Sequence, residues 1–133
     1  KGDKVIKKLM NAKLKGKNDA ILLLKEVPDP RRFGVAVINQ TKNKDIITNV
    51  EEKPKNPKSN LSIVALYRFG PSIFKALNEI RSGQKELQLT DAIQKLIDWG
   101  GNVSAIHLNE NDRVIDIGTA DSYLETITKF KNA

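Results

Sequence analysis

The chain has 133 residues, of which 39% are hydrophobic and 29% are charged, as is usual for one globular domain. It contains no cysteine, which excludes disulfides and cysteine-ligated metal sites and suits a reducing cytoplasm, where we expect the protein to work. The clearest apolar run, residues 20–24, is far too short to cross a bilayer, so we expect no membrane partner.

Positive charge is concentrated at the start of the chain. The net charge is +7, and residues 1–17 hold seven lysines against a single acid, Asp3. This segment could be the solvated face of a helix, or a surface that attracts nucleic acid or another polyanion. It contains none of the aromatic residues that accompany basic ones on single-strand-binding surfaces. We therefore expect no nucleic-acid partner.

The first half of the sequence predicts one helix followed by four strands. Apolar residues recur at helical spacing over 4–15, and Gly16 follows them as a stop signal. Runs of aliphatic and β-branched residues then predict strands over 20–27, 33–39, 46–52 and 61–69. The last run is apolar nearly throughout, which is typical of a central strand covered on both faces.

The second half alternates between helices and strands. Helices are predicted over 71–80 and 89–101, the second with Thr90 as its N-cap and Gly100 as its stop. Strands over 103–108 and 113–118 and a helix over 119–130 complete the chain. This alternation predicts an α/β fold in one domain, residues 1–133, with a mixed sheet flanked by helices.

Several common catalytic motifs are missing. The sequence has no glycine-rich phosphate loop and no GxSxG turn. The single histidine, His107, lies inside an apolar strand, where we expect a packed or edge residue and not a general base.

Polar residues at predicted strand ends are the remaining candidates for a site. Glu52 and Lys53 stand where a strand meets Pro54. Gly34 begins a strand, either as a plain turn glycine or where a ligand approaches the backbone. Asp116 lies between a predicted strand and a helix, either as a helix-capping acid or as a ligand of Mg²⁺ beside a phosphate.

Five segments of the chain, in this order, resemble the sugar-binding half of the sugar-1-phosphate nucleotidyltransferases. The resemblance covers residues 20–128, and its closing segments are most similar to the branch that makes UDP-glucose or dTDP-glucose. The segments are "EVPDPRRFGVAV" (26–37), "VEEKP" (50–54), "SNLSIVALYRF" (59–69), "ELQLTDAI" (86–93) and "DIGTADSYLE" (116–125).

The resemblance implies a reaction and the residues that bind its sugar substrate. An NTP, UTP or dTTP, would react with glucose 1-phosphate to give an NDP-glucose and pyrophosphate. Glu52 would accept hydrogen bonds from sugar hydroxyls, and Lys53 would contact the sugar phosphate as a catalytic residue. The backbone at Gly34 and Ile63 would face the hexose, with Tyr67 near it.

The resemblance also implies a magnesium cofactor and an incomplete domain. Asp116 would be a catalytic Mg²⁺ ligand, with Asp3 as the candidate second ligand. The family's N-terminal half, with its "GGxGTRLxPxT" loop, is not in this sequence. We therefore expect a Rossmann-like nucleotide-diphospho-sugar transferase fold that lacks this half, is inactive alone, and forms a homo-oligomer or pairs with the missing segment. The alternative is a non-catalytic regulatory module that binds a nucleotide sugar.

Overall fold

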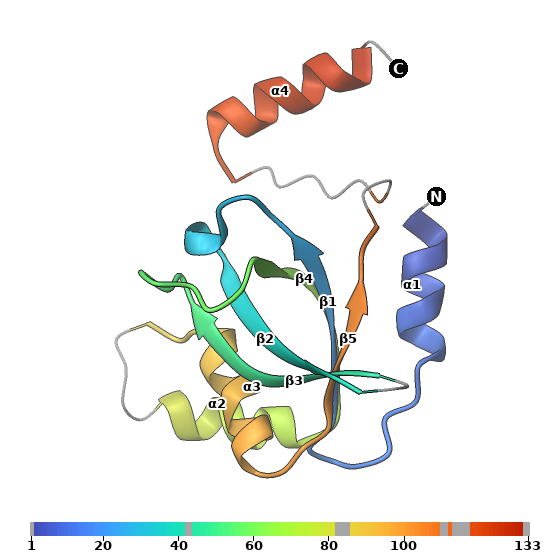
Figure 1. Cartoon of the computed structure of the whole chain (residues 1–133), viewed down its shortest axis with the longest axis vertical. Helices are drawn as coiled ribbons and strands as arrows, with labels where there is room; N and C mark the ends of the chain where they lie inside the picture. The colour runs from blue at the N-terminus through green and yellow to red at the C-terminus, as the bar shows by residue number, and fades with distance from the viewer. Residues whose placement is uncertain (1, 42–43, 82–85, 110–111, 113–117, 132–133) are drawn as a thin grey trace.

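The structure is a computed structural model that describes residues 2–41, 44–81, 86–109, 112 and 118–131, with backbone alone for 2–3 and 129–131. Figure 1 shows the order of its elements along the chain. These are α1 (Gly2–Asn11), β1 (Ala20–Glu26), the 3₁₀ turn η1 (Pro30–Arg32), β2 (Gly34–Gln40), β3 (Asp45–Glu52), β4 (Leu61–Phe69), α2 (Ser72–Arg81), α3 (Leu89–Asp98), β5 (Val103–His107) and α4 (Ala120–Lys131).

The predicted elements are confirmed wherever the structure describes the chain, although two helices end earlier than predicted. Helix α1 stops at Asn11, well before Gly16. Helix α3 stops at Asp98, and Gly100 follows it in the left-handed region at φ +75°. The N–H groups of Gly100 and Gly101 donate to the carbonyls of the last helical turn, which closes the helix end. The strand predicted over 113–118 lies outside the described residues, apart from its last position.

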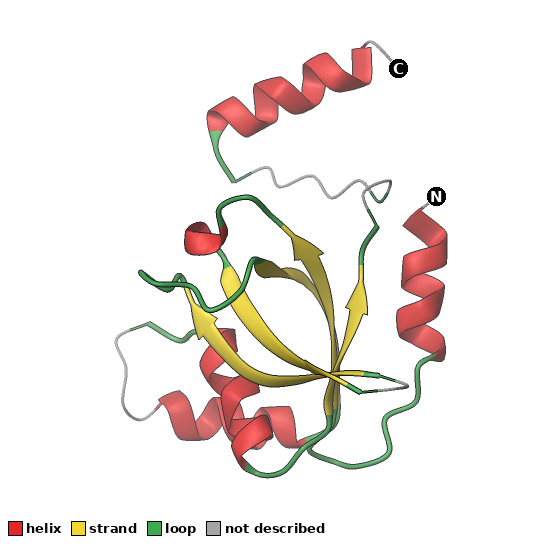
Figure 2. Ribbon diagram, viewed as in Figure 1, coloured by secondary structure: helices red, strands yellow, loops and turns green. Residues whose placement is uncertain are grey.

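The five strands form a mixed sheet that closes on itself in the order β1–β4–β2–β3–β5 (Figure 2). Strands β1 and β5 are parallel, and the other pairs are antiparallel. Two of the contacts that close the ring are single residue pairs, Val35 with Ser62 and Ile46 with Ser104. The prediction of an α/β fold with a mixed sheet and flanking helices is therefore confirmed.

Strand β1 is the most deeply buried strand, and its two faces are covered by different helices. Ala20, Leu22 and Leu24 face a core completed by α2 and α3, whereas Ile21 and Leu23 face α1. Figure 1 shows α2 and α3 together on one side of the strands and α1 on another. Residues 20–24 of β1 are all buried, and because side chains alternate between the faces of a strand, consecutive residues enter different cores.

The prediction that β4 is covered on both faces is wrong. The register between β1 and β4 shifts between Leu22 and Leu23, whose partners are Tyr67 and Val64. Ala65 and Leu66 therefore lie outside the pairing, and both are exposed. An apolar composition does not distinguish a buried strand from one that carries such an irregularity.

Helix α1 is held against the sheet by packing and by one guanidinium group. Leu9 is 5% exposed and packs near Ile21 and Leu23. Arg68 of β4 donates from Nη1 to the carbonyl oxygens of Leu9, Met10 and Ala12. The carbonyls of Leu9 and Met10 belong to the last turn of the helix, where intrahelical donors run out, and Ala12 follows the helix directly, so Arg68 caps the C-terminal end of α1.

Helix α4 lies apart from the sheet at the top of Figure 1. Its residues Tyr123 and Leu124 are more than half exposed. No helix in the described ranges combines the length and the apolar character needed to cross a membrane.

Candidate functional site

The candidate site lies where β2 begins and β3 ends. Gly34, the first residue of β2, pairs with Glu52, the last residue of β3. The N–H of Lys53 then donates to the carbonyl of Phe33 at 3.0 Å, which extends this pairing by one step. The start of β4 joins the same region through the pair of Val35 and Ser62. Three segments distant in sequence therefore meet at one end of the sheet.

Gly34 is in close contact with side chains from three other elements. A Cβ atom at this position would lie 2.9 Å from Thr90 Cγ2, 3.2 Å from Glu52 Oε2 and 3.4 Å from Ile63 Cδ1. The first of these separations is shorter than ordinary van der Waals contact. Crowding by these side chains therefore favours glycine here, and because Gly34 lies within β2, the structure does not support the alternative of a plain turn glycine.

The carboxylate of Glu52 is held through one of its oxygens. Thr90 donates from Oγ1 to Glu52 Oε2 at 3.2 Å. Within the described residues, Oε1 of the same carboxylate has no hydrogen-bond partner. The side chain is only partly buried, so this oxygen is free to accept a hydrogen bond from a ligand.

Thr90 does not cap α3, contrary to the prediction. The N-cap residue is Gln88, two positions earlier, and it makes no side-chain capping bond. Thr90 is therefore inside the first turn, is 6% exposed, and directs its hydroxyl toward β3. The sequence pattern favoured a threonine cap because hydroxyls often bond the backbone, but here a carboxylate is the acceptor.

A second residue of α3, Gln94, fixes the helix to β3. Its Oε1 accepts hydrogen bonds from the backbone N–H of Val50 at 2.8 Å and from Asn49 Nδ2 at 3.2 Å. Gln94 and Thr90 were missed as site residues. They are four positions apart, so they lie on one helix face, and this polar pair beside the buried apolar stripe is the signal that could have revealed them.

Ile63 and Tyr67 of β4 flank the register irregularity and pack against the core that includes α3. Tyr67 stacks on Phe69, with ring centroids 5.4 Å apart. Burial raises the pKa of Tyr67, and the negative charge of Glu52 raises it further. The charge of the Glu52 carboxylate therefore acts on the hydroxyl of Tyr67. The residues that the sequence singled out for sugar binding, Gly34, Glu52, Ile63 and Tyr67, lie in one region of the structure.

Lys53 has an unusual backbone conformation beside this region. Its φ is +42°, and it is the one non-glycine residue with a positive φ among the described residues. The residue before a proline is normally extended, and Lys53 precedes Pro54. Such strain, about 1–2 kcal/mol for a left-handed residue, often accompanies functional positions. The backbone conformation therefore marks Lys53 as a candidate functional residue, and its side chain is exposed.

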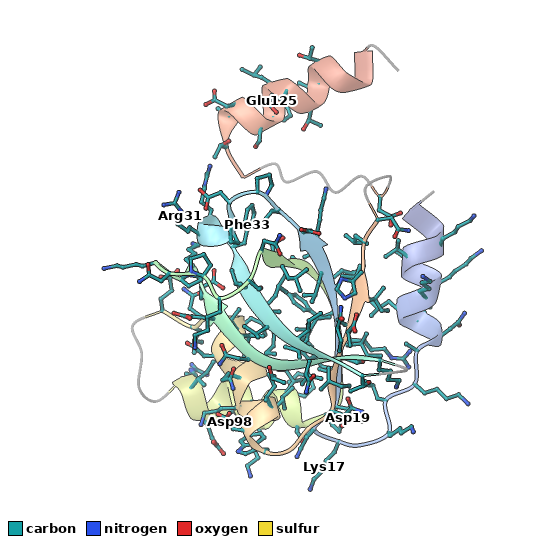
Figure 3. All side chains as sticks on the ribbon, viewed as in Figure 1. Lys17, Asp19, Arg31, Phe33, Asp98 and Glu125 are labelled. Atoms are coloured by element: carbon teal, nitrogen blue, oxygen red, sulfur yellow. The ribbon has the colours of Figure 1, made fainter. Side chains whose placement is uncertain are left out.

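The loop that leads into Gly34 is stiffened by an exposed ion pair. Arg31 binds Asp29 in a bidentate manner, with Nε to Oδ1 and Nη2 to Oδ2 both at 2.8 Å. The hydrogen bonds from Arg31 lower the pKa of Asp29 to about 2. Figure 3 labels Arg31 and Phe33 near the start of β2.

His107 lies far along β3 from the candidate site. It ends β5, and its Nε2 is 2.8 Å from Oδ2 of Asp45, the first residue of β3, whereas Glu52 is the last. The side chain of His107 is 39% exposed, so it is not packed in the core, and it pairs with Asp45 at the end of its strand.

An open groove of about 640 Å³ lies at the ends of β1 and β5. Residues 25–28, Asn60 and residues 108–109 line it. None of the predicted sugar-binding residues is among them, so this groove is separate from the candidate site.

The predicted metal ligands cannot be placed relative to this site. Asp116 lies outside the described residues, and Asp3 is described by its backbone alone, in the first turn of α1. Among the described side chains, no three His, Cys, Asp or Glu residues cluster as a metal site would. The magnesium site stays a prediction.

Comparison with known families assigns the chain. A family model described as nucleotidyl transferase matches residues 2–133. The chain belongs to the nucleotidyl transferase family. The chain is similar to a glucose-1-phosphate thymidylyltransferase of Streptomyces griseus, with 45% identity over 86 residues, which are 64% of this chain and 23% of the relative. It is also similar to the UTP–glucose-1-phosphate uridylyltransferase AglF of Haloferax volcanii, with 37% identity over 68% of this chain and 37% of the relative.

Solved structures support the same assignment. A UDP-glucose pyrophosphorylase from Acinetobacter baumannii matches 84% of this nucleotidyl transferase chain and 39% of its own, with a TM-score of 0.65 and 28% identity. A UDP-glucose pyrophosphorylase complexed with UDP-glucose has the same fold, with a TM-score of 0.74 and 24% identity over 86% of this chain and 45% of its own. The chain thus spans less than half the length of these relatives.

Proposed function

We propose that this nucleotidyl transferase chain supplies the sugar-phosphate-binding part of an enzyme that makes NDP-glucose. The reaction transfers a nucleotidyl group from UTP or dTTP to glucose 1-phosphate and releases pyrophosphate. The observation that carries the proposal is the convergence of Glu52 and Ile63 on the backbone of Gly34, within 3.2 and 3.4 Å of where its Cβ would be.

The geometry suggests a role for each residue of the site. Glu52 has one carboxylate oxygen bound to Thr90, which leaves Oε1 to accept a hydrogen bond from a hexose hydroxyl. The backbone at Gly34 and at Ile63 would face the hexose, as the family resemblance implies. Tyr67 contributes a partly buried ring beside the Glu52 charge. Lys53 follows Glu52 directly, and we assign its ammonium group to the phosphate of a sugar bound by Glu52.

The chemistry demands positioning and charge neutralisation more than proton transfer. The phosphate oxygen of glucose 1-phosphate is already ionised, so it can attack the α-phosphorus of the NTP without a general base. Lys53 neutralises and orients this phosphate. Asp116, with Asp3 as second ligand, would hold Mg²⁺, whose oxygen-ligand preference suits two carboxylates. When bound, the ion stabilises negative charge on the phosphate oxygens.

We further propose that the chain is the C-terminal part of its domain, is inactive alone, and works in the cytoplasm. The NTP base would be bound by the part of the domain outside these residues. Exposed apolar side chains favour a further partner: Leu66, Phe74 and Leu124 are 38%, 71% and 60% exposed. The partner would be a second copy or the remainder of the domain as a separate chain.

The proposal is tested by assaying the natural protein that contains this chain with glucose 1-phosphate and each NTP. We expect turnover with UTP or dTTP, and a loss of about a hundredfold or more in kcat/KM for Lys53→Ala and for Asp116→Ala. Both variants should retain the wild-type melting temperature.

Lys55→Ala is the matched control, since Lys55 is an exposed lysine two positions beyond Lys53 and should leave turnover unchanged. Near-native rates in Lys53→Ala or Asp116→Ala would remove that residue from the mechanism. A wild-type protein with no turnover on any NTP would refute the proposed function.

A further inference from the structure

Thr90 is buried between two residues of the candidate site. Its side chain is 6% exposed, its hydroxyl donates to Glu52 Oε2 at 3.2 Å, and its methyl group lies 2.9 Å from where a Cβ of residue 34 would be. One side chain of α3 therefore contacts both the carboxylate at the end of β3 and the glycine at the start of β2.

Helix α3 cannot slide along β3 without breaking other bonds. Gln94, one turn after Thr90, accepts the N–H of Val50 at 2.8 Å, two residues before Glu52. Ile93 and Leu96 of the same helix are fully buried in the core. The position of Thr90 relative to Glu52 is thus set by contacts that do not involve either residue.

A glutamate side chain samples several rotamers when nothing holds it. The hydrogen bond from Thr90 to Oε2 favours the rotamers of Glu52 that allow it. In these rotamers Oε1 is the oxygen without a partner in the described part of the chain. The hydroxyl of Thr90 already donates to Oε2, so a donor from a ligand would give Oε1 a partner as well.

We propose that Thr90 is a positioning residue, which orients Glu52 so that Oε1 meets a hexose hydroxyl, and whose methyl group closes the space behind Gly34. This inference rests on the proposed function, since it assigns Glu52 a sugar hydroxyl as its partner. It adds a residue of α3 to a site otherwise built from strand ends.

A purely structural role for the Thr90 hydroxyl, as a tie between α3 and β3, makes different predictions. Gln94 already supplies such a tie through two hydrogen bonds. A structural tie would affect stability and all kinetic constants together, whereas a positioning residue affects binding of the sugar substrate alone.

The test compares Thr90→Val, which keeps the shape and removes the hydroxyl, with Thr90→Ser, which keeps the hydroxyl and removes the methyl. In the natural protein that contains this chain, we expect Thr90→Val to raise KM for glucose 1-phosphate about tenfold. The value of kcat and KM for the NTP should stay within about twofold, as removal of a binding contact alone requires. Thr90→Ser should keep KM for glucose 1-phosphate within about threefold of wild type by the same reasoning.

Substrate analogues make the test specific to Glu52. The Thr90→Val penalty should disappear with the one monodeoxy glucose 1-phosphate that lacks the hydroxyl bound by Glu52, and persist with the others. Gln94→Leu is the control for a structural tie. Buried Ile93 and Leu96 still hold α3 in the core of this variant, so it should lower the melting temperature without a selective change in KM. If Thr90→Val does not fold, Thr90→Ala replaces it as the variant without a hydroxyl, compared with Thr90→Ser.

Two results would overturn this inference and leave the proposed function standing. One is an active enzyme in which Thr90→Val, or Thr90→Ala in its place, binds glucose 1-phosphate as well as Thr90→Ser. The other is an equal penalty with every deoxy analogue. A wild-type protein without turnover would overturn both proposals.

Discussion

The two faces of β1 pack into hydrophobic cores of very different size. Ala20, Leu22 and Leu24 enter a core that includes α2, α3 and strands β2 and β3, with thirteen buried residues in the described chain. Ile21 and Leu23 enter a core that has three buried residues in the described chain and is completed by α1. Consecutive residues of one strand therefore contribute to a large core and a small one.

This difference explains where the candidate site lies. The large core fixes α3 against β3, and these elements carry Thr90 and Glu52. The small core holds α1, whose lysines face solvent and whose C-terminal end depends on Arg68. The site residues, whose positions must be accurate, lie on the side of the large core, and the basic helix α1 lies on the side of the small core.

The largest expected effect is on stability when the large core is opened. Leu22 is fully buried, so Leu22→Ala should lower the free energy of unfolding by about 3–5 kcal/mol. Leu9 packs α1 against the small core, and Leu9→Ala should cost about 2–3 kcal/mol because the loosely held helix can relax into the space. Urea unfolding of the purified variants measures both.

Ile6→Ala is the control on α1, because Ile6 is 48% exposed and its loss should cost less than about 1 kcal/mol. Equal losses in Leu22→Ala and Leu9→Ala would show that the two cores contribute equally, and the comparison between the faces would fail.

A smaller effect on stability is expected at Asp19, where the α1–β1 connection meets the α3–β5 connection. Its carboxylate accepts backbone N–H bonds from Lys15, Gly16 and Asn102, which join the α1–β1 and α3–β5 connections. Burial opposes ionisation, but these bonds outweigh it and lower the pKa of Asp19. Because the folded pKa is depressed, this stabilisation is fully present above the unfolded pKa and is lost as pH falls through the folded pKa.

We therefore expect the stability of the wild-type protein to fall as the pH drops below 3.8, the ordinary pKa of an aspartate. The fall should be smaller in Asp19→Asn. At neutral pH, Asp19→Asn should cost about 1–3 kcal/mol, because an amide offers one acceptor oxygen where the carboxylate uses two. Thermal melts across the acid range measure this. Asp98→Asn, an exposed carboxylate, is the control, and identical acid profiles for all three proteins would contradict the role of Asp19.

Local sequence signals predicted most of the fold because periodicity and stop signals are local. The strand over 61–69 has the predicted bounds, and Gly100 ends α3 as predicted. The closing of the sheet could not be predicted, because the pairs Val35–Ser62 and Ile46–Ser104 join residues distant in sequence. Nor could the sequence show that β1 is more deeply buried than β4, since both are apolar runs.

The candidate site was predicted in part. Resemblance indicated Gly34, Glu52 and Ile63, and the structure brings them together. Thr90 was predicted as a cap because a threonine before an apolar helix usually serves the backbone. Its hydrogen-bond partner, Glu52, is 38 residues away in the sequence, so a local sequence pattern could not predict this bond.

The most direct test of the central claim is an amide NMR titration of the natural protein containing this chain with glucose 1-phosphate. The account predicts that the amide signals of Gly34, Lys53 and Ile63 shift on binding, while those of Lys7 and Lys8 on α1 do not. Shifts confined to the lysines of α1, with the Gly34, Lys53 and Ile63 signals unchanged at saturation, would contradict it.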